Sequence, residues 1–224
     1  HVPGRSGEGM ASVVLKSEQE IQKMRAAGRV VREALERCTQ ACRSGASTMD
    51  IDRAAVEVFE AHGAKALFKN YPTYRPGEGF PGHVCVSINE EVVHGIPSSK
   101  RTIKEGDIVS IDCGAQIDGW CSDAAVTVAV GEVDPRTTEL CRVTEHMLRI
   151  AVENIRPGRK WSQIARLMEN YARQAGFGVV QEYVGHGIGR KLHEEPKVPN
   201  FVSPDLVRHD IDLRPGMVLA VEPM

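Results

Sequence analysis

The stretch EGDIVSID, residues 105–112, shows how this chain is organised. A turn glycine, Gly106, is followed by alternating apolar and polar residues, which predict a strand with one buried face. The strand ends on an acid, Asp112. The same arrangement returns in PGMVLAVE, residues 215–222, where the strand ends on Glu222 at the same distance from its own turn glycine. The two stretches are the first indication of an internal repeat.

The residues upstream of the two strands repeat as well. Gly45, Ile51 and Gly63 in the first half correspond, at one constant spacing, to Gly158, Ile164 and Gly176 in the second. Apolar residues at three- and four-residue steps predict four helices: from Ser17, over residues 48–62, from Pro135, and over residues 161–176. Ser17 and Glu20 form a capping box at the start of the first helix. Ser162 is expected to cap the fourth helix and Gly176 to end it. Alternating patterns predict strands over residues 83–89, 106–114, 123–131, 178–185 and 216–223.

These elements indicate an α+β protein made of two halves, about residues 17–131 and 132–224, each ordered helix, helix, strands. A pseudo-twofold axis between such halves would bring the ends of corresponding strands to one central place, and Asp112 and Glu222 with them. A chain of 224 residues, 42% of them hydrophobic, can bury one full core, so a single domain is expected over residues 10–224.

Composition argues against several classes of protein. The formal net charge of -2 disfavours a partner such as nucleic acid or an anionic membrane, which usually requires a basic excess. No apolar run approaches the roughly 18 residues of a membrane span, and no signal-peptide pattern opens the sequence. The six cysteines form no CxxC pair, so reduced thiols in a cytoplasmic protein are expected. The first nine residues, HVPGRSGEG, are expected to be an artificial leader before a native start at Met10.

Acidic residues gather around the strand that ends at Asp112. In IDCGAQIDGWCSD, residues 111–123, the pair Asp118-Gly119 is a strong hairpin signal that would set Asp112 beside Asp123. Asp118, at the turn, would face solvent. Two carboxylates that meet in a partly buried place are costly unless they share a proton or hold a cation. The pair therefore indicates a metal.

The stretch GHGIGRKLHEEP, residues 185–196, adds two histidines. Its glycine pattern is a weak match to a phosphate loop, because no amphipathic helix follows, and Pro196 excludes the helix of an HExxH zinc protease. The glycines disfavour any helix, so His186 and His193 need not converge on one atom. One would bind metal and the other substrate; two exposed loop histidines are the alternative. His94 precedes Gly-Ile-Pro much as His186 precedes Gly-Ile-Gly.

Together, two aspartates from one half and a histidine and a glutamate from the other suit a divalent ion such as Mn, Fe, Co or Zn. Several carboxylates with few histidines favour a pair of metals. Such a pair generates hydroxide near neutral pH and polarises a carbonyl, so the implied reaction class is hydrolysis.

Four motifs resemble those of type I methionine aminopeptidases, in order and at compatible spacings: EVVHGIP (91–97), IDCGAQIDGWCSD (111–123), GHGIGRKLHEEP (185–196) and GMVLAVEPM (216–224). The match covers roughly Lys16 to Met224. The resemblance implies the pita-bread fold, in which two pseudo-twofold-related halves surround a central antiparallel sheet. Carried over residue by residue, it implies that the metal ligands are Asp112, Asp123, His186 and Glu222.

The resemblance also implies a reaction. Hydroxide bound to two divalent ions (Co, Mn, Fe or Zn) would attack the first peptide carbonyl and release N-terminal methionine, favouring a small second residue. His193 would contact the carbonyl oxygen, His94 would lie near the scissile amide nitrogen, and Glu222 would shuttle a proton. Phe80 and Cys85 would line the methionine pocket, where an apolar, polarizable wall suits a thioether.

The expected partners are the N-termini of nascent polypeptides, met at the ribosome, with no nucleic acid and no membrane, and the enzyme is expected to be a monomer. The short stretch between His193 and Glu222 favours type I over type II, which carries a helical insertion there. The lack of a Cys/His zinc-binding extension indicates a bacterial-type enzyme. A proline-specific relative of the same fold is disfavoured, because no large N-terminal domain is present.

One feature of the family lies beyond this sequence. Family members continue past EPM to further strands that supply a fifth ligand, a bridging glutamate, whereas the sequence stops at Met224. The C-terminal strands are therefore expected to be absent from this sequence, and at least one metal is expected to bind poorly. If the natural chain ends here, the alternative is a metal-free or inactive pita-bread interaction protein.

Overall fold

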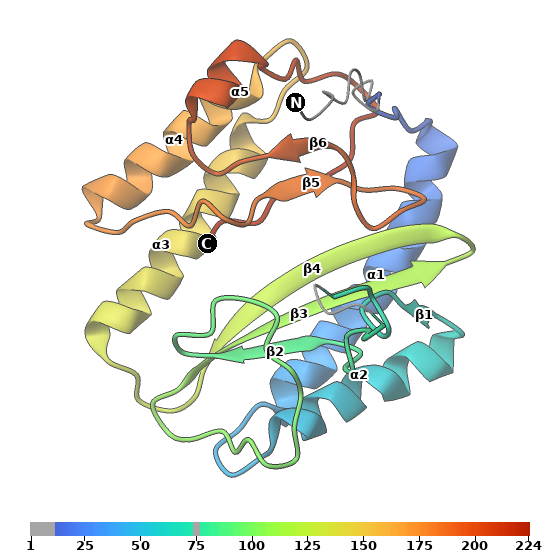
Figure 1. Cartoon of the computed structure of the whole chain (residues 1–224), viewed down its shortest axis with the longest axis vertical. Coiled ribbons are helices and arrows are strands. Elements are labelled where there is room, and N and C mark those ends of the chain that lie inside the picture. The colour runs from blue at the N-terminus through green and yellow to red at the C-terminus, as the bar shows by residue number, and fades with distance from the viewer. Residues whose placement is uncertain (1–11, 74–76) are drawn as a thin grey trace, which may run out of the picture.

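The first helix begins where the sequence predicts it. In the computed structural model, which describes residues 12–73 and 77–224, α1 spans Glu18–Ala41 (Figure 1). Ser17 Oγ accepts a hydrogen bond from Glu20 N at 3.3 Å, and Ser17 N donates to Glu20 Oε2 at 2.8 Å. The predicted capping box is therefore confirmed, and the helix starts from a signal that is entirely local.

The other helices follow similar rules. The second helix, α2, spans Thr48–His62, as predicted, and ends at Gly63, whose φ of 60° is left-handed. The third, α3, spans Pro135–Asn154 and has the predicted proline at its first position. Two further helices are α4, Trp161–Gln174, and the short α5, Pro204–Arg208. Within the described ranges, every helix is too short or too polar to cross a membrane.

The strands of the described residues form two antiparallel sheets, one in each half (Figure 1). The first sheet contains β1 (Lys65–Ala66), β2 (Cys85–Ile88), β3 (Ile108–Ile117) and β4 (Trp120–Ala129); the second contains β5 (Gly185–Gly187), β6 (Glu194–Val198) and β7 (Leu219–Ala220). β3 pairs with each of the other strands of the first sheet, and β5 lies between β6 and β7. Figure 1 shows α1 and α2 on the side of the first sheet and α3 and α4 on the side of the second.

The two halves share their hydrogen bonds as well as their sequence pattern. In each half, the backbone N–H of a turn glycine donates to the carbonyl oxygen of a buried aliphatic residue at 2.9 Å. The N–H of that aliphatic residue donates in return, at 2.8 Å, to the carbonyl oxygen of the residue that follows the glycine. The matching sets are Gly45, Ile103 and Ala46 in the first half, and Gly158, Leu213 and Arg159 in the second. The glycines have φ of 87° and 83°. The predicted internal repeat is therefore present in the backbone.

Each half has its own apolar core. Ile51, Val109 and Ile111 are fully buried between the helices and the sheet of the first half. Trp161 and Ile164 are fully buried in the second, where Trp161 Nε1 donates to the carbonyl of a loop residue at 2.7 Å. The indole nitrogen thus has a partner although the ring has no exposed surface, as burial of a polar atom requires.

The start of α4 differs from the prediction. Ser162 lies inside the helix at its second position, and Lys160 precedes the helix. The distant Asp210 supplies the cap: its Oδ1 accepts from Ser162 N at 3.1 Å and its Oδ2 accepts from Ser162 Oγ. The prediction that Ser162 caps α4 is therefore wrong. The acceptor that satisfies the N–H groups at a helix end can come from a distant part of the chain.

Replacing Asp210 by alanine should lower the free energy of unfolding at neutral pH by about 1 kcal/mol, the typical effect of losing such a cap. Burial by itself raises the pKa of Asp210, but hydrogen bonds from Ser162 and Ile211 hold it below its ordinary value of 3.8. A carboxylate with a lowered folded-state pKa stabilises the fold above its ordinary pKa, and this contribution is lost as the pH falls through the folded-state pKa. Urea unfolding of wild type and variant should therefore show a difference that narrows below pH 3.8. A difference that stays constant into acid would contradict this role.

The strand predicted over residues 178–185 is wrong for most of its length. Only Gly185 belongs to a strand, and residues 178–184 are irregular. They are anchored by a hydrogen bond from Val180 N to Met224 O at 2.9 Å. Because a strand needs a continuous ladder with a neighbour, alternating apolar residues are not sufficient where the described chain places no strand alongside. Similarly, β7 covers only Leu219–Ala220 of the range predicted over residues 216–223, because these are the residues that pair with β5.

Candidate metal centre

The hairpin of β3 and β4 brings two candidate ligands together. Asp118 and Gly119 at its tip both have left-handed backbone, with φ of 49° and 78°, as the turn predicted from the sequence requires. The residue opposite Asp123 is Gly114, two positions along the strand from Asp112. Residues two apart share a face, so Asp112 and Asp123 are diagonal neighbours on one face of the ladder. Asp118 is exposed, as expected.

The position of β5 explains the glycines around His186. A Cβ on Gly185 would lie 2.3 Å from Ala220 O, and a Cβ on Gly187 would lie 2.3 Å from Glu195 O. Both distances are too short for non-bonded atoms, so only glycine lets the backbones of the neighbouring strands approach this closely. The two glycines therefore fix His186 between β6 and β7. They serve strand packing rather than phosphate binding.

Asp123, His186 and Glu222 form a group that could hold a cation, because one ligand atom of each lies within 4.8 Å of the others. His186 Nε2 is 3.0 Å from Glu222 Oε1 and 3.5 Å from Asp123 Oδ2. The side chains of His186 and Asp123 are only 8% and 9% exposed. Even so, His186 Nε2 and Asp123 Oδ1 have no hydrogen-bond partner with adequate geometry among the described residues. Buried polar atoms without partners are costly, and a bound cation would satisfy both.

The pKa values show that this group favours positive charge. Burial by itself lowers the pKa of His186, but contacts with Asp123 and Glu222 outweigh it and raise the pKa to about 10. The pKa of Asp112 lies well above its ordinary value because of burial and because Asp123 and Glu222 repel another negative charge. Asp112 thus lies beside the three-residue group, and the negative charges of that group raise its pKa. Carboxylate oxygens with one imidazole fit a divalent ion such as Mn, Fe, Co or Zn.

Glu222 is held by a residue that the sequence did not reveal. Asn200 is fully buried, and its Nδ2 donates to Glu222 O at 2.6 Å. The two residues are 22 apart in the chain. An asparagine in the irregular stretch after β6 gives no local signal of burial, so sequence patterns could not have assigned it.

His193 lies beside His186 but has a different partner. The ring centroids of the two histidines are 4.3 Å apart, and His193 Nδ1 lies 2.7 Å from Tyr71 Oη. Burial lowers the pKa of His193, and the charge of the neighbouring His186 lowers it further. Tyr71 was not predicted as a site residue, because it is 122 positions from His193 and only the fold brings them together.

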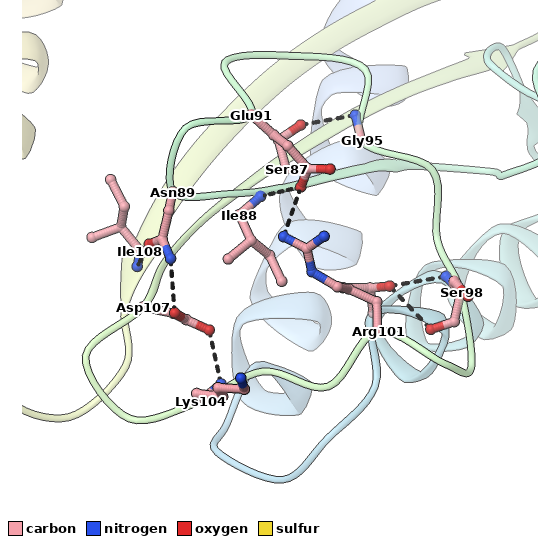
Figure 2. A network of polar contacts seen from close by, with 11 residues as sticks. Ser87, Ile88, Asn89, Glu91, Gly95, Ser98, Arg101, Lys104, Asp107 and Ile108 are labelled. Carbon is pink, nitrogen blue, oxygen red and sulfur yellow. Dashed lines mark hydrogen bonds and ion pairs between the residues drawn. The ribbon is translucent and has the colours of Figure 1, made fainter.

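His94 stands in a loop with left-handed backbone, at a φ of 62°. Its ring is exposed and lies edge-on to Tyr183, with centroids 5.2 Å apart. The loop is tied to β2, since Gly95 N donates to Ser87 Oγ at 2.9 Å (Figure 2). Figure 2 shows the rest of the network, which joins Ile88 to Glu91, Asn89 to Asp107 and Lys104 to Asp107. A non-glycine residue kept at positive φ by its surroundings is typical of functional sites.

Phe80 and Cys85 lie in an apolar cluster that adjoins the acids. Cys85 pairs with Asp112 between β2 and β3. Burial raises the pKa of the Cys85 thiol and the charges of Asp112 and Asp123 raise it further, so the thiol stays neutral. The other buried members of the cluster are Met24, Phe68, Trp120, Cys121, Ile188 and Leu192. Phe80 and Cys85 therefore lie in one buried apolar cluster, beside the strand position of Asp112.

Known proteins resemble this chain in both sequence and fold. The model of metallopeptidase family M24 matches residues 22–224. The chain is 42% identical to a methionine aminopeptidase of Clostridium acetobutylicum, covering 95% of this chain and 81% of that protein, and 41% identical to methionine aminopeptidase 1 of Bacillus subtilis, covering 95% and 82%. The crystal structure of the methionine aminopeptidase from Thermotoga maritima matches with a TM-score of 0.88 at 40% identity, covering 95% of this chain and 82% of that one. The chain therefore belongs to metallopeptidase family M24, as one of its methionine aminopeptidases.

Proposed function

We propose that this chain releases the N-terminal methionine of polypeptides by hydrolysis, at a metal centre held by Asp123, His186 and Glu222 with Asp112 beside them. The observation that carries the proposal is a pair of buried atoms, His186 Nε2 and Asp123 Oδ1, which lie within a group of acids and make no hydrogen bond of adequate geometry to the described residues. Relatives that are methionine aminopeptidases at 41% and 42% identity support the same reaction.

The residues around the centre have complementary roles in this proposal. A divalent ion bound there would polarise the scissile carbonyl and lower the pKa of a water molecule. His193, next to the group but bonded to Tyr71, can donate a hydrogen bond to the carbonyl oxygen as negative charge develops on it. Glu222 can carry a proton from the attacking water to the leaving amine. His94, in its fixed loop, would face the scissile amide nitrogen.

Selectivity for methionine would come from the apolar wall. Phe80 offers an aromatic face and Cys85 a neutral thiol, and both are buried. A flexible thioether makes favourable contacts with sulfur and with aromatic rings, whereas a charged side chain would lose its hydration there. The site would further favour a small second residue in the substrate.

The charge of the site supports two ions of Co, Mn, Fe or Zn. Asp112, Asp123 and Glu222 are three carboxylates around one imidazole, and they repel one another strongly enough to raise the pKa of Asp112. A single divalent ion would leave one negative charge of the three uncompensated. A second ion would more than offset that charge, and shared carboxylates would hold the pair.

We infer that the substrate is the N-terminus of a newly made polypeptide, met at the ribosome by a monomeric enzyme in the cytoplasm. All six cysteines are free thiols and five of them are buried, which fits a reducing compartment. The alternative function, a metal-free interaction protein, is not supported. The four predicted ligands are retained, three of them form one group, and the relatives are enzymes.

The test is peptide hydrolysis with added metal. In the presence of Mn or Co, the protein should release methionine from Met-Ala-Ser at least about 10-fold faster than leucine from Leu-Ala-Ser, the scale on which an apolar pocket discriminates similar side chains. A chelator should stop the reaction, and added metal should restore it. No release with Mn, Co, Fe or Zn would overturn the proposal, and equal release from both peptides would overturn the methionine specificity.

A further inference from the structure

The two histidines of the site differ in what their Nδ1 atoms contact. His186 Nδ1 lies 2.8 Å from Gly187 O. A carbonyl oxygen can only accept, so His186 carries its proton on Nδ1, and in the neutral ring the Nε2 lone pair is free for a metal. His193 Nδ1 instead lies 2.7 Å from Tyr71 Oη, and a phenol can donate. The partners can therefore set opposite tautomers in neighbouring rings.

We propose that Tyr71 is a positioning residue that donates a hydrogen bond to His193 Nδ1 and so places the proton of the neutral ring on Nε2. A neutral imidazole has one N–H, so a nitrogen that accepts from Tyr71 leaves the other as a donor. That donor suits a substrate carbonyl oxygen and cannot bind metal. The arrangement agrees with the metal group, of which His193 is not a member among the described residues. The inference rests on the proposed function for the role of His193.

The segment that carries Tyr71 is built to hold the phenol in place. Tyr71 N donates to Phe68 O at 2.9 Å, and Phe80 N donates to Tyr71 O at 2.8 Å. Asn70 N donates to Phe80 O at 2.9 Å. Gly79 packs so closely here that a Cβ on it would lie 2.6 Å from Asn70 Cα. Hydrogen bonds from the N–H and to the carbonyl oxygen of Tyr71 therefore fix the position of its backbone, from which the side chain extends.

Two aromatic rings contact the ring of His193. Tyr71 meets His193 edge-on, with centroids 5.6 Å apart and planes at 75°. His186 contacts the same imidazole, with centroids 4.3 Å apart and planes at 67°. An imidazole in contact with two rings has less freedom to turn over and exchange its nitrogens. Its tautomer is then set by the hydrogen-bond partner of Nδ1, which is Tyr71.

The test is the variant Tyr71→Phe, which keeps the ring and removes only the hydroxyl. Nitrogen-15 NMR of labelled histidine, at about pH 8 where an ordinary imidazole is neutral, reads the tautomer in metal-free protein and in protein loaded with diamagnetic zinc. The spectrum of His193→Gln identifies the His193 signals. Wild type should show His193 protonated on Nε2, and Tyr71→Phe should show a mixture of tautomers. Tyr171→Phe, which removes a hydroxyl that contacts Arg142, is the matched control; its ring packs against His146, and the His193 signals should stay unchanged.

Kinetics give the second measurement. Tyr71→Phe should lower kcat for Met-Ala-Ser about 10-fold while KM changes little, a smaller loss than the 100- to 1,000-fold typical of removing an oxyanion donor outright. A His193 signal protonated on Nδ1 in wild type, or a tautomer unchanged in Tyr71→Phe, would overturn the proposal even if the activity fell. A tautomer that shifts in a protein without methionine release would uphold the role of Tyr71 and refute the proposed function instead.

Discussion

Replacing His186 by alanine should abolish methionine release, with a loss of more than about 100-fold, because even a residue that only supports a metal ligand typically contributes 10- to 100-fold. His186 Nε2 lies between the two acids of the group, 3.0 Å from Glu222 Oε1 and 3.5 Å from Asp123 Oδ2. Removing the imidazole leaves carboxylates alone, which attract a cation but no longer surround it. Release of methionine from Met-Ala-Ser with Mn or Co measures the loss, and isothermal titration calorimetry measures the metal affinity.

The control for this prediction is His209→Ala. His209 is exposed at the end of α5. Its backbone N–H donates to Asp205 O, a hydrogen bond that alanine would keep. This variant should therefore keep its activity and its metal affinity. If His186→Ala remained folded by circular dichroism and retained more than about a tenth of the wild-type rate, well above the loss expected for a ligand, His186 would not be a metal ligand.

The candidate ligands Asp112 and Asp123 could be brought together from the sequence because one locally defined hairpin carries both, although the strand expected to end at Asp112 continues to Ile117. Asp118-Gly119 marks a turn by its residue types alone, and the turn determines how Asp123 faces the strand of Asp112. The repeat then places Glu222 by analogy with Asp112. Each of these inferences needed only the residues within one hairpin or one strand, together with the relation between the two halves.

The residues that support the centre could not be predicted, because their contacts are made across long stretches of chain. Asn200 holds Glu222 from 22 residues away, and Tyr71 contacts His193 across 122. The missed cap of α4 has the same origin, since its acceptor lies 48 residues from Ser162. The strand predicted over residues 178–185 fails for a related reason: its pattern is local, but its ladder would have to come from elsewhere.

A buried ion pair next to the site illustrates how much such a distant contact can contribute. Lys16 Nζ lies 2.5 Å from Glu194 Oε2, and the two side chains are only 3% and 10% exposed. Glu194 Oε1 also accepts from the backbone N–H groups of Arg190 and Lys191, at 2.8 and 3.1 Å. Glu194 thus closes the loop that ends at His193, although sequence patterns assign it no role in the site. Burial by itself raises the pKa of Glu194, but Lys16 and these N–H groups bring it below its ordinary value.

Replacing Lys16 by methionine should lower the free energy of unfolding by about 3 kcal/mol, because breaking a buried pair leaves its partner charge without compensation. The N–H groups that still contact Glu194 keep the loss near the lower end of the usual range. The matched control is Arg32→Met, which breaks a surface pair with Glu36 whose side chains are 82% and 57% exposed and should change stability by less than about 1 kcal/mol. The double variant Lys16→Met/Glu194→Gln should lose less than the sum of the single losses, since no unpaired charge remains. Urea unfolding of wild type, Lys16→Met, Glu194→Gln, the double variant and Arg32→Met measures these losses. Additive losses, or a Lys16→Met loss no larger than that of Arg32→Met, would show that the pair does not stabilise the loop of His193.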